Sequence, residues 1–67
     1  MRAVILSIGD ELAAGLTVNT NASWLAQQLT AVGIRVDAHL TVGDALLPIV
    51  DAVRATLEQR PDLLLIS

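Results

Sequence analysis

The sequence contains no cysteine, no lysine and a single aromatic residue, Trp24. Without cysteine, no disulfide can stabilise a chain of 67 residues, and chains of about this size bury only roughly 60% of the surface that the unfolded chain exposes. The absence of cysteine fits a reducing compartment, so we expect a cytoplasmic protein. The lack of lysine and the net charge of −3 argue against a nucleic-acid surface, which needs clustered Lys and Arg.

Long hydrophobic runs and targeting segments are also missing. Hydrophobic residues make up 54% of the chain, but no apolar run approaches the roughly 18 residues that a membrane span needs. No basic segment followed by an apolar one indicates a signal peptide. We therefore expect no membrane association, and the length allows one domain, residues 1–67, with no second domain.

The hydrophobic pattern of the first half predicts a strand followed by a helix. Residues 3–8 are apolar and β-branched, which is typical of a strand buried on both faces. Residues 22–32 carry apolar side chains at helical spacing. Thr20 or Asn21 is expected to cap the start of this helix, and Gly33 to follow its end in a left-handed conformation.

The second half predicts a strand, a helix and a third strand. Residues 34–42 alternate apolar and polar side chains, which predicts a strand with one solvent-exposed face. Asp44 is expected to cap the next helix, Pro48 to lie in its first turn and Arg60-Pro61 to end it. Residues 63–67 form another apolar strand. The apolar stripe expected on the second helix comprises Leu46, Ile49, Val50, Val53 and Leu57.

The order βαβαβ with helical crossovers predicts a parallel sheet of spatial order 2-1-3. The third strand is apolar on both faces, so its outer edge would be an aggregation hazard if left exposed. We therefore expect a fragment, or a homo-oligomer or complementary segment that covers this edge.

Ligands of open parallel sheets bind beyond the carboxyl ends of the strands. Here those ends are Gly9-Asp10-Glu11, Gly43-Asp44 and Ser67, so three carboxylates are expected at one edge. Such a set suits a hard cation such as Mg²⁺. The opposite edge is expected to be basic, with Arg2, Arg35 and Arg60 and only Asp62 as an acid.

Each of these residues also fits a purely structural role. Asp10 and Glu11 suit the N-terminus of a short helix through its dipole, and Asp44 suits a cap. Asn19 and Asn21 are typical turn and cap residues, and an amide that faces a ligand is the less frequent alternative.

The motifs "GDEL", "NTN" before a helix, "TVGD" and "LLLIS", at these spacings, resemble the molybdopterin-binding (MoaB/Mog-like) domain, in particular the N-terminal domain of the CinA family. The resemblance spans the whole chain. It implies a three-layer α/β/α fold with a largely parallel sheet, of which this chain would be the amino-terminal part.

The resemblance also implies a nucleotide- or pterin-type anionic ligand at the carboxyl edge and a divalent metal, Mg²⁺ or Mn²⁺. In CinA-type proteins this domain is associated with ADP-ribose pyrophosphatase activity, whereas the relatives MogA and MoeA act in molybdenum cofactor synthesis. Carried over, Glu11 and then Asp44 are the expected catalytic acids, and Asp10 joins them as a metal ligand. The expected ligand-binding residues are Gly9, Asp10, Asn19, Asn21 and Ser67.

The chain departs from the family pattern at its end. After a strand like "LLLIS" the family continues with a Thr-Gly-Gly-rich loop and further acids, and later with a deamidase domain. We expect these residues to hold about half of a site and to be inactive alone. Three hypotheses remain: part of a nucleotide pyrophosphatase, molybdopterin binding, or a non-catalytic interaction module.

Overall fold

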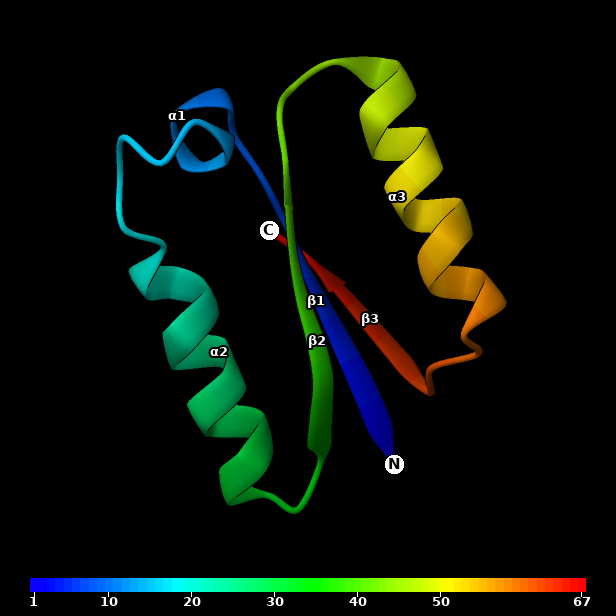
Figure 1. Ribbon diagram of the computed structural model, residues 1–67. Helices are drawn as coiled ribbons and strands as arrows, with labels where there is room; N and C mark the ends of the chain where they lie inside the picture. The colour runs from blue at the N-terminus through cyan, green and yellow to red at the C-terminus, as the bar shows by residue number, and fades with distance from the viewer.

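The computed structural model describes all residues, Met1–Ser67. The elements follow in the order β1 (Arg2–Ile8), α1 (Asp10–Ala13), α2 (Thr20–Ala31), β2 (Arg35–Val42), α3 (Leu46–Glu58) and β3 (Leu63–Ile66). All strand pairs are parallel and the sheet order is β2-β1-β3, as predicted. The sheet lies between α2 on one side and α3 on the other, which makes three layers (Figure 1).

The core is centred on β1. Ile5 and Leu6 are 0% exposed, and Ala3 and Val4 are also buried. Because helices cover both faces of this central strand, its side chains meet protein on either side, as a continuous apolar run requires. Burial of each large side chain contributes about 1.5–3 kcal/mol.

Both helices pack mainly against β1 and β2, so β3 is the less covered strand. Leu63, Leu64 and Leu65 are half-buried, and Ile66 is 55% exposed. The strand pairs on one side only, with β1, and its other edge carries no strand. None of the helices is long and apolar enough to pass through a bilayer.

The predicted cap of α2 was wrong by one or two residues. The helix is capped by Asn19, whose Oδ1 accepts a hydrogen bond from the backbone N–H of Ala22 at 3.1 Å. Thr20 and Asn21 already lie inside the helix, so they cannot cap it. The prediction for the other end is confirmed, since Gly33 has φ = 85°, which a glycine adopts without a Cβ clash.

The predicted cap of α3 was also wrong. Ala45 occupies the cap position and makes no side-chain bond, because Asp44 lies one residue too early to reach the first turn. Pro48 does lie in that turn, where its missing N–H costs no helical hydrogen bond.

The apolar stripe of α3 is shorter than predicted. Ile49, Val50 and Val53 are half-buried, but Leu46 and Leu57 are 72% and 58% exposed. The fully buried position of α3 is a polar residue, Thr56, which is 3% exposed. Its Oγ1 donates to the carbonyl of Ala52 at 2.8 Å, so the hydroxyl is satisfied within the helix.

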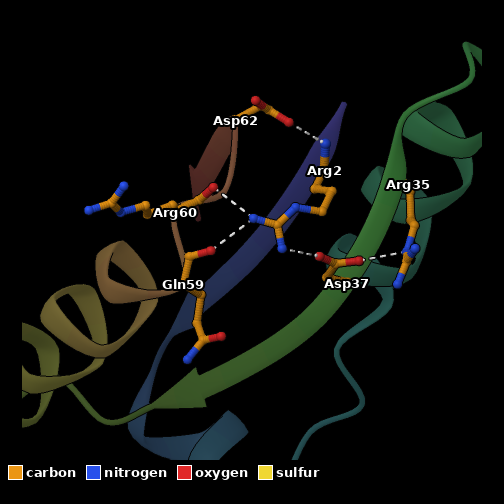
Figure 2. Close-up of polar contacts among 6 residues, drawn as sticks. All are labelled: Arg2, Arg35, Asp37, Gln59, Arg60 and Asp62. Carbon is orange, nitrogen blue, oxygen red and sulfur yellow. Dashed lines mark hydrogen bonds and ion pairs between the residues drawn. The ribbon is translucent and has the colours of Figure 1, made fainter.

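The edge at which the strands begin contains an acid, Asp37, that we did not predict there from the sequence (Figure 2). The β1–β2 register shifts between Ala3 and Val4, which leaves Asp37 as the extra residue of β2. Its carboxylate accepts from Arg2 Nη1 at 3.1 Å and from Arg35 Nε at 2.7 Å. The expectation of Asp62 as the only acid at this edge was therefore wrong.

Arg2 joins this edge to the end of α3 (Figure 2). Its Nη2 donates to the carbonyls of Gln59 and Arg60, both at 2.8 Å. Its backbone N–H donates to Asp62 Oδ2 at 2.7 Å. One side chain thus satisfies carbonyls that the helix end leaves without partners.

Candidate ligand site at the carboxyl ends of the strands

The ends of the three strands are joined by backbone hydrogen bonds at one edge of the sheet. Ser67 N–H donates to Leu6 O and Ile8 N–H donates to Ser67 O, both at 2.9 Å. Gly9 N–H donates to Val42 O at the same distance. The segments that begin at Gly9, after Val42 and at Ser67 therefore meet at one edge, as the parallel topology predicts.

Asp10 connects the start of α1 to the end of β2. Its Oδ1 accepts the backbone N–H of Asp44 at 2.9 Å. A Cβ at Gly43 would lie 2.5 Å from that oxygen, which is too close for any side chain. Gly43 is thus required for the approach of Asp10, and one carboxylate oxygen of Asp10 remains outside this bond.

The three expected acids lie at the same edge but do not form a ready-made metal cage. Asp10, Glu11 and Asp44 are all exposed. No three His, Cys, Asp or Glu side chains lie close enough together to hold a metal ion. The two aspartates meet through a backbone N–H and not through converging carboxylates. The metal-binding and catalytic roles of these acids stay predictions.

Asn19 is held at both ends of its amide. Besides capping α2 through Oδ1, it donates from Nδ2 to Ser7 Oγ at 2.6 Å. Ser7 is 2% exposed at the carboxyl end of β1. Our sequence reasoning missed Ser7, although it is the only polar residue in the apolar run 3–8 and directly precedes the polar segment.

Asn21 lies two residues further along, in the first turn of α2. Its Nδ2 donates to Ser67 Oγ at 2.7 Å, and both residues are exposed. Two of the predicted ligand-binding residues, from segments 46 positions apart, are therefore brought together at the edge where the strands end. Their ligand-binding role is not tested by this contact.

Residues 4–67 match the protein family described as "Probable molybdopterin binding domain". The match covers the "GDEL" segment (9–12), the "NTN" segment (19–21), β2, β3 and β1 from Val4 onward. The chain belongs to this family. Membership confirms the resemblance drawn from the "GDEL", "NTN" and "TVGD" motifs.

Relatives of this molybdopterin-binding-type domain include CinA-like proteins. The CinA-like protein of Chlorobium phaeobacteroides is 46% identical over 67 residues, which is 100% of this chain and 16% of the relative. A protein of Pyrococcus horikoshii is 43% identical over 65 residues, which is 97% of this chain and 26% of the relative. The chain thus spans only a minor part of the length of these curated relatives.

A solved structure has the same fold. The crystal structure of the protein CinA with unknown function from Thermoplasma acidophilum superposes with a TM-score of 0.88 at 37% identity. The alignment covers 97% of this chain and 38% of that chain. The three parallel strands in order β2-β1-β3 are therefore a fold shared with a CinA protein.

Proposed function

We propose that this chain supplies one wall of a site for an anionic nucleotide, and that a longer protein containing it hydrolyses a pyrophosphate of the ADP-ribose class. The observation that carries the proposal is the Asn21–Ser67 hydrogen bond of 2.7 Å at the edge that also holds Asp10, Glu11 and Asp44. Neutral donors and free carboxylates at one edge suit a ligand that contains both hydroxyl and phosphate groups.

The neutral part of the edge would bind the ligand directly. Asn21 and Ser67 are exposed and carry donors for phosphate or ribose oxygens. In the first turn of α2 the backbone N–H of Thr20 donates to Val18 O and that of Ala22 to Asn19 Oδ1, which leaves the N–H of Asn21 for a ligand. This N–H and the positive end of the helix dipole both favour an anion. The carboxylates alone would repel the same anion.

The donor chemistry of the acidic part fits a hard divalent cation. Mg²⁺ typically takes one or two carboxylates and completes its shell with waters and substrate phosphates, so a cage of three acids is not required. Glu11 and the second oxygen of Asp10 would hold the ion, with Asp44 as a further acid nearby. A bound ion would polarise the pyrophosphate and acidify a bound water. Within this chain, Glu11 would orient that ion against the phosphates.

Molybdopterin is the second candidate ligand, favoured by the description of the family that residues 4–67 match. Molybdopterin also carries an anionic phosphate group, so the same donors could bind it. The outer edge of β3, which has no paired strand, supports a second copy or a complementary segment as a partner in either case.

A calorimetric titration of the 67-residue chain tests the proposal, with ADP-ribose and molybdopterin as ligands, each with and without Mg²⁺ or Mn²⁺. We expect binding of ADP-ribose that depends on the metal and is lost in Glu11→Gln. Glu58→Gln is the matched control, because Glu58 is an exposed acid at the end of α3, near the other edge.

The outcomes separate the candidates. Tight, metal-independent binding of molybdopterin without binding of ADP-ribose would favour the pterin alternative. If neither ligand binds, the result would favour the third hypothesis, a non-catalytic interaction module. For the longer protein, turnover of ADP-ribose that is unchanged in Glu11→Ala would remove Glu11 from the mechanism.

A further inference from the structure

The two asparagines of the segment 19–21 are bonded in different ways. Asn19 uses its oxygen to accept from Ala22 N–H and its nitrogen to donate to Ser7 Oγ. Because a backbone N–H can only donate, the oxygen must face Ala22 and the nitrogen must face Ser7. Both ends of the Asn19 amide are therefore engaged inside the protein.

Asn21 keeps capacity that Asn19 does not. Its nitrogen donates one of its two N–H groups to Ser67 Oγ, which leaves the second N–H for an anion, and its oxygen has no hydrogen-bond partner in the chain. Asn21 is exposed, whereas Asn19 is half-buried and Ser7 is 2% exposed. A ligand at this edge can thus reach Asn21, whereas Asn19 is less accessible and both ends of its amide are bonded to the protein.

The Ser7–Asn19 bond also fixes where Asn21 lies. It ties the residue that begins α2 to the end of β1 at 2.6 Å. Ser67 is tied to the same strand by backbone bonds to Leu6 and Ile8. Both members of the Asn21–Ser67 pair are therefore tied to β1, Asn21 through the start of α2 and Ser67 through the backbone.

On the basis of the proposed function, we infer that Asn19 is a positioning residue that acts with Ser7, and that Asn21 is the asparagine that contacts the ligand. Asn19 serves the site through the placement of the first turn of α2. Loss of the Ser7–Asn19 bond displaces Asn21 from Ser67 without removing any group that touches the ligand.

The variant Asn19→Ser separates this role from helix capping. Serine caps helices about as well as asparagine, but its side chain carries no second polar end to reach Ser7. With ADP-ribose and Mg²⁺ as the probe, we expect about fivefold weaker binding, the usual effect of one lost hydrogen bond. Gln27→Ala, which removes an exposed amide of α2, should leave the affinity unchanged.

A double-mutant cycle with Asn21→Ala decides between positioning and direct contact. If Asn19 acts through Asn21, Asn19→Ser should weaken binding by less than about twofold once Asn21 is already alanine, because the two effects are coupled. An equal fivefold loss in both backgrounds would overturn the inference and make Asn19 an independent ligand contact.

A measurement without ligand keeps the inference testable if wild type binds no ADP-ribose and the proposed function itself fails. The side-chain amide resonances of Asn21 report its hydrogen bond to Ser67. We expect them to shift in both Asn19→Ser and Ser7→Ala and to stay in place in Gln27→Ala. Unmoved Asn21 resonances in a folded Asn19→Ser chain would refute the positioning role.

Discussion

Gly43→Ala tests the contact on which the acidic edge is built. The new Cβ would lie 2.5 Å from Asp10 Oδ1, and Cβ atoms in proteins essentially never approach another heavy atom closer than 3.0 Å. The carboxylate must therefore move, and it loses its hydrogen bond to Asp44 N–H. A hydrogen bond to a charged group contributes about 1.5–3 kcal/mol, and we take the lower end because this one is exposed.

A second effect of Gly43→Ala has the opposite sign. Gly43 does not need a left-handed backbone, so alanine restricts the unfolded chain and stabilises the fold by about 0.5 kcal/mol. The net expectation is a loss of about 1 kcal/mol in the free energy of unfolding. In an Asp10→Ala background the clash and the bond are both absent, and the same substitution should stabilise by about 0.5 kcal/mol.

Urea unfolding followed by far-UV circular dichroism measures this change of sign in four chains: wild type, the two single variants and the double variant. Gly33→Ala is the control. Gly33 has φ = 85° and open space around its Cβ position, so alanine should cost about 1 kcal/mol in either background. The reasoning is refuted if Gly43→Ala has the same effect with and without Asp10.

The other predictions concern the opposite edge and the core. Arg2→Ala should lower the free energy of unfolding by about 2 kcal/mol, because it removes the donors to two carbonyls and to a carboxylate, whereas Arg54→Ala should change it by less than about 0.5 kcal/mol. Thermal unfolding measures both, and equal effects would contradict the role of Arg2. Ile5→Ala should cost about 2–5 kcal/mol at a 0% exposed position, and Leu57→Ala, at a 58% exposed one, much less. Equal losses in urea unfolding would show that β1 is not the core.

The sheet was predictable because its signals are local and strong. The apolar run before Gly9 marks a central strand, and the strict alternation in 34–42 marks an edge strand, so the order 2-1-3 follows from pattern and crossover length alone. The convergence of Gly9, Gly43 and Ser67 follows in turn, since it depends only on strand direction.

Two of the predictions that were wrong, the cap of α2 and the acids of the opposite edge, depend on contacts between segments that are distant in the sequence. Asn19, Thr20 and Asn21 are all good caps by residue type, and the buried hydroxyl of Ser7 contacts Asn19 and no other of the three. Asp37 joins Arg2 because the β1–β2 register shifts beside it. Neither a hydrogen bond across 12 residues nor a register shift is encoded in hydrophobic periodicity.

The "GDEL" segment (9–12) and the "NTN" segment (19–21) share one arrangement. In the first, Asp10 binds the backbone after Gly43, while the side chain of Glu11 makes no hydrogen bond within the chain. In the second, Asn19 binds Ser7, while Asn21 keeps a free oxygen. Each segment therefore carries one residue that fixes it to the end of β1 or β2, and one exposed residue whose side-chain oxygens make no hydrogen bond within the chain. If this division is correct, variants of Asp10 and Asn19 should lower stability, and variants of Glu11 and Asn21 should lower ligand affinity in chains that unfold like the wild type. A loss of stability from Glu11→Gln as large as that from Asp10→Ala would contradict the division, because Glu11 would then hold the fold as well.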